Sequence, residues 1–217
     1  MGIFAAMLDL MFPPKCAFCR KILSDGEKGM CAKCEKELRR TSDGGKQTGD
    51  YYSVCVSPLY YEDTVRESLL RFKFSDITAY ADVYGKLIAG CIRENLAGKY
   101  DLISWVPLSA KRLRARGYDQ AMLIAMSAAL DLQDVAVSTL EKIHDVPAQS
   151  GMGSEEKRKA NISGAYRCAD EELVAGKRIL LIDDIITTGS TLSECAKTLL
   201  ISGAEEILCA TLARSVD

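Results

Sequence analysis

Two neighbouring carboxylates and a hydroxyl-rich loop are the residues of this chain best suited to chemistry. An apolar run, Ile179–Ile182, ends in Asp183 and Asp184. The loop that follows groups hydroxyls around one glycine, as Thr187, Thr188, Gly189, Ser190 and Thr191. The carboxylates suit a ligand with hydroxyl groups or a metal ion. The loop offers several N–H and O–H donors, which suit a phosphate.

A strand before this loop and a helix after it would hold these groups in place. Apolar residues recur after the loop at a helical spacing, as Leu192, Ala196, Leu199 and Leu200. The positive end of the helix dipole would then favour an anion at the loop. An ordinary capped helix is the alternative, because Thr191 and Glu194 fit a capping box. That alternative leaves the two carboxylates unexplained. The segment resembles the phosphoribosyl-pyrophosphate (PRPP) signature of type I phosphoribosyltransferases.

A cluster of cations follows another apolar run, Leu102–Val106. Four of them lie between positions 111 and 116, as Lys111, Arg112, Arg114 and Arg116. If this turn is helical, Arg112 and Arg116 share one face. Guanidinium pairs hold phosphate oxygens in a bidentate manner. An exposed helix edge would be the simpler interpretation of the cluster alone. Beside a PRPP-like loop, we expect the pair to contact pyrophosphate.

Two Cys-x-x-Cys pairs near the amino terminus have the spacing of a zinc site. They consist of Cys16, Cys19, Cys31 and Cys34. Four thiolates can surround Zn²⁺ tetrahedrally and leave no position for water, so the metal would be structural. Its binding would supply folding free energy on the order of 10 kcal/mol to a segment too short for a core of its own. Two redox-active pairs are the alternative, which this spacing disfavours.

The composition is that of an ordinary globular protein. The chain has 217 residues, a net charge of −2 and 27% charged residues, which give no global attraction to nucleic acid or membrane. Nine cysteines without a secretion signal indicate a reducing compartment, so we expect a cytoplasmic protein. No transmembrane segment is predicted. Met1–Phe12 could form an amphipathic helix that packs on the chain itself, with contact to the inner face of the membrane as the alternative.

The pattern of apolar segments predicts two parts. The polar, glycine-rich stretch Thr41–Asp50 indicates a linker, so we divide the chain into a zinc-finger-like module, residues 1–45, and a second domain, residues 46–217. In the second domain, strands alternate with helices, which predicts an α/β fold with a mostly parallel sheet flanked by helices. The expected strands are Val54–Tyr60, Leu102–Val106, Ile179–Ile182 and Ile207–Leu212. The expected helices are Thr64–Phe74, Ala79–Leu96 and Gln120–Leu130.

Together these features resemble the ComF family of competence-associated proteins. That family joins an amino-terminal four-cysteine zinc module to a type I phosphoribosyltransferase domain. Its Arg-Gly-Phe-Asn-Gln stretch is matched by residues 116–120, and its Asp-Asp-x-x-Thr-Thr-Gly loop by residues 183–189. Its Gln…Arg-x-x-Asn-x-x-Gly-Ala-Phe stretch is matched through Gln149, Arg158, Asn161 and Tyr166. From composition alone, this third stretch is a flexible loop leading to a short strand.

The resemblance implies a type I phosphoribosyltransferase-like protein that binds PRPP with Mg²⁺ and is associated with DNA uptake in natural transformation. It implies that Asp183 and Asp184, the catalytic pair, hold the ribose hydroxyls. It also implies that the loop Thr187–Thr191 binds the 5-phosphate and that Arg112 and Arg116 bind pyrophosphate. Whether the chain is an enzyme, and which acceptor it uses, stay open.

A second class of function stays open beside the transferase. The same fold could serve as a non-catalytic factor that senses PRPP or handles single-stranded DNA. The zinc module would then contact the DNA, and proteins of the competence machinery would be further partners. This sequence also departs from the usual family pattern at four positions. It has Trp105, Asp119, Lys142 and Val146 where the family usually has Pro, Asn, Arg and Thr.

Overall fold

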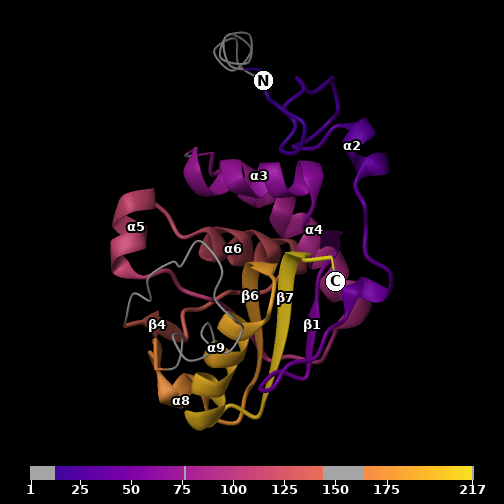
Figure 1. The fold of residues 1–217 in the computed structure, drawn as a ribbon. Helices are drawn as coiled ribbons and strands as arrows, with labels where there is room; N and C mark the ends of the chain where they lie inside the picture. The colour runs from indigo at the N-terminus through magenta and orange to yellow at the C-terminus, as the bar shows by residue number, and fades with distance from the viewer. Residues whose placement is uncertain (1–12, 76, 144–163, 217) are drawn as a thin grey trace.

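A parallel sheet of five strands forms the centre of the molecule (Figure 1). The computed structural model of the chain describes residues 13–75, 77–143 and 164–216. The strand order is β1 (Val54–Val56), β7 (Glu206–Arg214), β6 (Arg178–Ile186) and β3 (Leu102–Trp105), and β2 (Leu59–Tyr60) also pairs with β7. Every pairing in this sheet is parallel. The predicted mostly parallel sheet is therefore confirmed.

Helices cover both faces of this sheet because its central strands are apolar on both sides. Side chains alternate along β6, so that Leu180 and Ile182 share a core with α4 (Tyr80–Asn95) and α6 (Gln120–Leu132). Ile179 and Leu181 share a second core with α9 (Ser190–Ile201), which lies in front of the sheet in Figure 1. The flanking helices are thus those that the periodicity predicted.

Smaller elements surround this three-layered body. They are α2 (Ala32–Glu37), the 3₁₀ turn η1 (Asp43–Gly45), α3 (Asp63–Phe74), α5 (Ala110–Arg116), α8 (Glu171–Val174), β4 (Leu140–Lys142) and β5 (Tyr166–Cys168). Strands β4 and β5 form a separate antiparallel pair. Among the helices that the structure describes, none is both long and apolar enough to cross a membrane.

Two predicted strands differ from the observed ones. The predicted strand Val54–Tyr60 is divided into β1 and β2, because Pro58 has no N–H for the ladder and the N–H of Ser57 donates to Gly44 O at 2.7 Å. Strand β6 continues four residues past the predicted end at Ile182, to Ile186, because its pairing with β7 persists. The two carboxylates therefore lie within the strand.

The stretch Thr41–Asp50 is packed rather than a loose linker. The N–H of Thr41 donates to Pro58 O at 3.0 Å, and Gln47 and Cys55 exchange two backbone hydrogen bonds of 3.0 and 2.7 Å. Gly45 within it is buried. These bonds add the stretch to the edge of the sheet beside β1. The division of the chain near residue 45 stays a prediction.

The four-cysteine module (residues 13–38) packs against the rest of the chain. Ala17 and Phe18 are buried in the same hydrophobic cluster as Leu69 of α3 and Tyr84 of α4. The ring centroids of Phe18 and Tyr84 lie 5.9 Å apart. Figure 1 shows the module at the top of the molecule, next to α3. The module therefore shares a core with the helices that cover one face of the sheet.

Substitutions of two glycines in α4 test how closely this helix packs on α6. A Cβ at Gly85 would meet Ser127 Oγ at 2.4 Å and Ala128 N at 2.7 Å, whereas a Cβ at Gly90 would meet nothing within 4 Å. We expect Gly90→Ala to stabilise the protein by about 0.5–1 kcal/mol, the helix preference for Ala over Gly. Gly85→Ala should lower the melting temperature despite the same preference, because α6 must move. Equal effects of the two substitutions in urea denaturation would contradict this packing.

Candidate functional site

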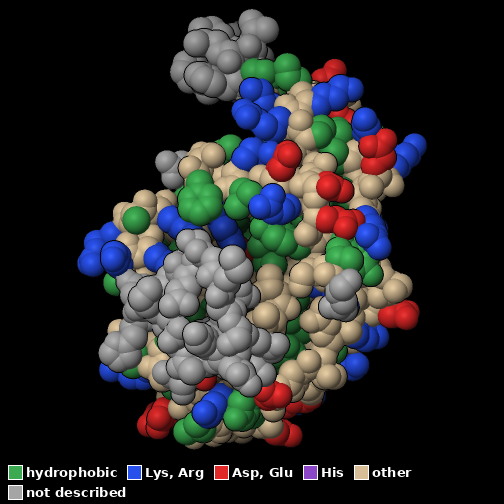
Figure 2. All heavy atoms as spheres, viewed as in Figure 1, with side chains coloured by type: hydrophobic (Ala, Val, Ile, Leu, Met, Phe, Trp, Pro, Cys, Tyr) green, Lys and Arg blue, Asp and Glu red, His purple; other side chains and the backbone are tan. Residues whose placement is uncertain are grey.

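A cleft of about 320 Å³ lies at the carboxyl ends of β3 and β6. The predicted site residues that line it are Arg112, Arg116, Asp183, Asp184, Thr187 and Thr191. Ligands of parallel α/β sheets bind at this end of the strands. Figure 2 shows Lys and Arg side chains gathered over α5, beside this region. The structure thus brings the carboxylates, the hydroxyl loop and the cationic helix to one place.

The two carboxylates point to opposite faces of β6, as neighbours on a strand do. Asp184 is 7% exposed, and its N–H donates to Asp183 Oδ1 at 2.8 Å. Burial, together with the adjacent Asp184 carboxylate, raises the pKa of Asp183. Two charges at this depth cost folding free energy unless cations compensate them. Such a pair is suited to binding hydroxyl groups or a metal ion.

Lys73 of α3 is a cleft residue that we did not predict. Its Nζ lies 2.5 Å from Asp184 Oδ2. Burial alone would lower the pKa of Lys73, but the charge and hydrogen bond of Asp184, together with the charge of Asp183, outweigh it and raise that pKa, so the ammonium stays charged. In the sequence, a lysine at the end of an amphipathic helix has the pattern of any solvent-facing cation. No sequence signal therefore distinguished it.

The hydroxyl loop forms a small recess beside the cleft. A pocket of about 30 Å³ is lined by residues 183 and 185–192, the loop Thr187–Thr191 included. Gly189 has φ +72°, and a Cβ there would meet the hydroxyl of Tyr52 at 2.7 Å, so glycine is required on both grounds. Tyr52 is buried and holds this turn from the side of β1.

The capping box expected at this helix is absent. Gly189 is the N-cap of α9 and provides no side-chain cap, while Glu194 accepts from the N–H of Gly164 at 2.6 Å. The alternative of an ordinarily capped helix was therefore wrong. The first turn of α9 keeps N–H groups directed at the recess, where a helix N-terminus favours an anion.

The cationic segment forms the helix α5, and its two predicted arginines share one face. Arg112 and Arg116 line the cleft, whereas Lys111 and Arg114 are exposed. Arg116 Nη1 donates to Gln120 Oε1 at 2.8 Å. Within the described residues, Gln120 Nε2 is buried without a hydrogen-bond partner, which leaves a donor at the cleft.

Asp119, one of the departures from the family pattern, has a structural role. Its Oδ1 accepts from the N–H of Met122 at 3.1 Å, which caps α6, and its Oδ2 accepts from the N–H of Leu108 at 2.8 Å. A carboxylate accepts both bonds with its two oxygens, whereas an Asn in this geometry would turn its NH2 donor toward one of the two N–H groups. Burial raises the pKa of Asp119. The anion thus ties the loop after β3 to α6.

Lys142, a second departure, also lines the cleft. Its Nζ donates to the hydroxyl of Tyr166 at 3.0 Å, across the β4–β5 pair. The three predicted loop residues Gln149, Arg158 and Asn161 lie outside the described residues, as does Val146. Their assignment stays a prediction.

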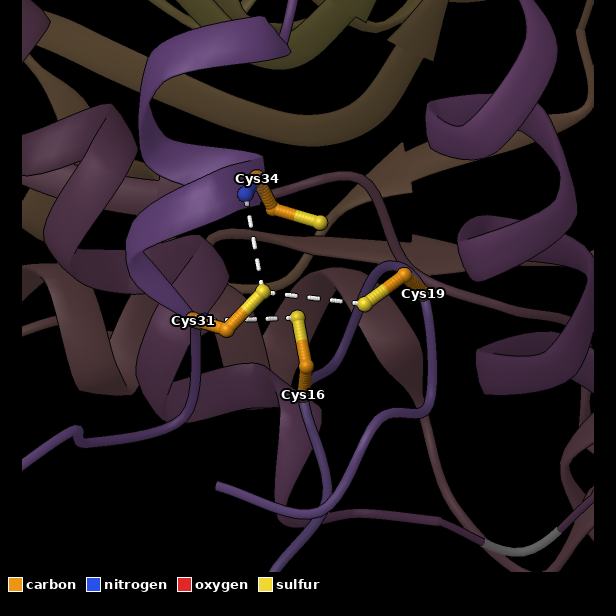
Figure 3. A group of neighbouring side chains, drawn as sticks. All are labelled: Cys16, Cys19, Cys31 and Cys34. Carbon is orange, nitrogen blue, oxygen red and sulfur yellow. Dashed lines mark hydrogen bonds between the residues drawn. The ribbon is translucent and has the colours of Figure 1, made fainter. Parts of the chain in front are cut away.

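The four cysteines of the amino-terminal module converge on one point (Figure 3). The Sγ atoms of Cys16, Cys19, Cys31 and Cys34 all lie within 4.8 Å of one another. Cys31 and Cys34 come from the start of α2, and Cys16 and Cys19 from the turn before it. Four thiols this close together can surround a tetrahedral Zn²⁺ with bonds of about 2.3 Å to sulfur. The residues fit a structural zinc ion.

Known proteins share both parts of the chain. Residues 120–216 match the phosphoribosyl transferase domain family, and residues 7–46 match the double zinc ribbon domain family. The chain is 27% identical over 224 residues to competence protein F of Haemophilus influenzae, which covers 93% of this chain and 97% of that protein. It is 26% identical over 231 residues to DNA utilization protein YhgH of Escherichia coli, which covers 94% and 100%. The chain is a homologue of these two proteins.

A third relative matches the chain over part of its length. Competence protein ComFC of Bacillus subtilis is 28% identical over 156 residues, which is 71% of this chain and 62% of that protein. The chain thus joins a phosphoribosyl transferase domain to an amino-terminal zinc ribbon, as the motifs predicted. Both the resemblance and the fold class are confirmed.

The buried carboxyl pair predicts a pH-dependent stability. The pKa of Asp183 is raised, so above the ordinary carboxyl pKa of about 4 the folded chain binds more protons than the unfolded chain, and stability falls as pH rises. We expect Asp183→Asn to melt above wild type at pH 8, by about 2–4 °C per kcal/mol recovered. The difference should shrink toward pH 5 in calorimetry without PRPP and Mg²⁺. Asp25→Asn, an exposed site, should show no such change. If the Asp183→Asn protein melts below wild type at pH 8, the ionised carboxyl of Asp183 does not lower the stability of the folded protein.

The zinc assignment predicts a metal content that depends on these four thiols alone. The wild type should contain about one zinc ion per chain, measured by elemental mass spectrometry. Cys34→Ser should lose the zinc and melt at a lower temperature, because metal binding stabilises such modules. Cys168→Ser, outside the cluster, should keep it. Zinc-free wild type from chelator-free purification would reject the site.

Proposed function

We propose that this cleft binds PRPP together with Mg²⁺ and supports transfer of its phosphoribosyl group to an acceptor. One observation carries the proposal. A single cleft of about 320 Å³ gathers a carboxyl pair, the hydroxyl loop at a helix N-terminus and two arginines on one helix face. PRPP carries ribose hydroxyls, a 5-phosphate and a pyrophosphate, which are the partners that these three groups suit.

The division of the three groups between the cleft and its recess supports the proposal. The recess of Thr187–Thr191 suits the 5-phosphate, because hydroxyls and the α9 N–H groups line it. Asp183 lines both the recess and the cleft, so the ribose would lie beside it and Asp184. Arg112 and Arg116 line the cleft and suit the pyrophosphate.

The proposed chemistry needs little from the protein beyond positioning and charge. The bond between C1 of the ribose and the pyrophosphate oxygen breaks, and the acceptor forms a new bond to C1. The sugar becomes oxocarbenium-like, so the carboxylates would stabilise its positive charge. The arginines would stabilise the negative charge that collects on the leaving pyrophosphate.

Magnesium fits the donor set of this cleft. Mg²⁺ is usually held by one or two carboxylates together with substrate phosphates, and Asp183 and Asp184 supply such oxygens. When bound, the ion would neutralise pyrophosphate charge. The residues of the chain would orient the ribose and keep the leaving group on the cationic side of the cleft.

We further propose that the protein acts in DNA uptake during natural transformation. The support is the names of its relatives, which are a competence protein and a DNA utilization protein. Direct binding of single-stranded DNA by the zinc module is not favoured by a specific observation. Phe18 is 1% exposed against Tyr84, so it offers no platform for stacking a base.

Calorimetry with PRPP and Mg²⁺ tests the proposal. Wild type should bind PRPP. Asp184→Ala should lose binding, because it removes both the proposed contact to the ribose and the ion pair with Lys73. Arg112→Met should weaken binding by about 10- to 100-fold, the loss of a charge-assisted hydrogen bond. Lys111→Met, an exposed cation on the same helix, is the matched control and should bind like wild type. No binding by wild type, or equal binding by wild type and Asp184→Ala, would reject the proposal.

A further inference from the structure

Helix α3 lies next to the four-cysteine module (Figure 1), and its side chains contact both that module and the cleft. Arg71 and Lys73 are two residues apart, so at 3.6 residues per turn they leave the helix about 200° apart. Arg71 reaches the module, and Lys73 reaches the carboxyl pair. A single rigid element therefore sets the position of the cleft lysine relative to the zinc ribbon.

The contact with the module is polar and specific. Ser68 Oγ donates to Ala17 O at 2.5 Å, and Arg71 Nη2 donates to the carbonyls of Ala17, at 3.3 Å, and Phe18. These carbonyls belong to the turn between the zinc ligands Cys16 and Cys19. The order of such a turn depends on the metal, because zinc binding and folding of these modules are linked. The metal site therefore fixes two acceptors to which α3 is attached.

The contact with the cleft involves the last turn of α3. Lys73 Nζ lies 2.5 Å from Asp184 Oδ2, with 22% of the lysine side chain exposed. An ammonium carries three donors, so Lys73 can hold Asp184 and donate to a ligand oxygen together. The hydroxyl of Tyr118 donates to Phe72 O, and the Arg116 guanidinium lies 5.3 Å from the Phe74 ring centroid. A shift of α3 would therefore move Lys73 relative to both Asp184 and Arg116.

The charges of the cleft explain why a ligand would need Lys73. Three carboxyl groups line it, Asp119, Asp183 and Asp184, and these would repel a phosphorylated ligand. Lys73 is the cation that neutralises the carboxylate nearest to it. Arg112, Arg116 and Lys142 lie on the other walls. Without Lys73, the ribose end of the cleft would be negative.

We propose that Lys73 is a binding residue for the phosphorylated ligand and that the zinc ribbon positions it through Arg71 and α3. This inference rests on the proposed function for the identity of the ligand, PRPP. The claim that the zinc ribbon positions Lys73 rests on the geometry of the protein alone. It gives the zinc ribbon a role in this cleft, in which Arg71 is a positioning residue and Lys73 contacts the ligand.

Chemical labelling tests the positioning without any ligand. Zinc-loaded protein is acetylated with a limiting amount of an N-hydroxysuccinimide ester, and mass spectrometry compares Lys73 with the exposed Lys86 of α4. Lys73 should react several-fold more slowly than Lys86 in wild type. Arg71→Met should accelerate Lys73 alone, toward the rate in Asp184→Asn, which lacks the charged partner. Arg66→Met, on the exposed side of α3, is the matched control and should leave Lys73 slow.

Calorimetry with PRPP and Mg²⁺ then tests the binding role. Lys73→Met should weaken binding by about 10- to 100-fold, the cost of a lost charge-assisted hydrogen bond, and Lys73→Arg should recover part of it. Arg71→Met should weaken binding less than Lys73→Met. The double variant should bind like Lys73→Met, because Arg71 acts through Lys73. Zinc content and melting temperature are measured for each variant, so that loss of folding is recognised.

The outcomes separate this inference from the proposed function. If wild type does not bind PRPP but Arg71→Met exposes Lys73 to labelling, PRPP is not the ligand and the binding role of Lys73 is rejected. The positioning of Lys73 by the zinc ribbon is then still supported. If wild type binds PRPP and Lys73→Met binds equally well, the binding role is wrong. If Arg71→Met and Arg66→Met leave Lys73 equally slow, or if the losses from Lys73→Met and Arg71→Met multiply, the zinc ribbon does not act through Lys73.

Discussion

The placement of two adjacent carboxyl groups in an apolar strand, with Asp184 buried and Asp183 partly buried, is the constraint on which the rest of this structure depends. Asp183 continues the register of β6 with β7, opposite Thr211, so the pairing fixes the face of the sheet from which its side chain leaves. Asp184 leaves the opposite face and has Lys73 as its partner. Such an arrangement costs stability in the free protein, since each buried charge must be compensated. Proteins accept such a cost where a ligand will use the groups, which supports the proposal that the end of β6 is a binding site.

The elements around the carboxyl pair bring cations to it. Helix α3 supplies Lys73, α5 supplies Arg112 and Arg116, and β4 supplies Lys142. Asp119 ties α6 to the loop between β3 and α5, because it caps α6 and also accepts from the N–H of Leu108. The zinc ribbon shares a core with α3 and α4, so it is part of the support of this cleft. Family membership and cleft geometry thus agree on a phosphoribosyl transferase domain whose zinc ribbon packs against it.

Much of the fold could be predicted because the apolar periodicity was strong. Strands β3, β6 and β7 and helices α3, α4 and α6 follow from it, and the two Cys-x-x-Cys pairs predicted the metal cluster. The extension of β6 past Ile182 could not be predicted, because carboxylates normally end a strand and only pairing with β7 keeps them in it. The capping box was wrong because Glu194 bonds to a distant segment, at Gly164. Lys73 was missed since its role depends on a partner more than a hundred positions away.

The site residues themselves were predicted from local spacing, and the structure places the ones it describes around one cleft and its recess. Their roles depend on which ligand atoms face which walls. A crystal structure of the zinc-loaded protein with PRPP and Mg²⁺ tests this most directly. We expect the 5-phosphate in the recess of Thr187–Thr191, the ribose hydroxyls at Asp183 and Asp184, and the pyrophosphate toward Arg112 and Arg116, with Lys73 in contact with the ligand. PRPP bound away from this cleft, or bound with its phosphate far from the recess, would contradict this expectation.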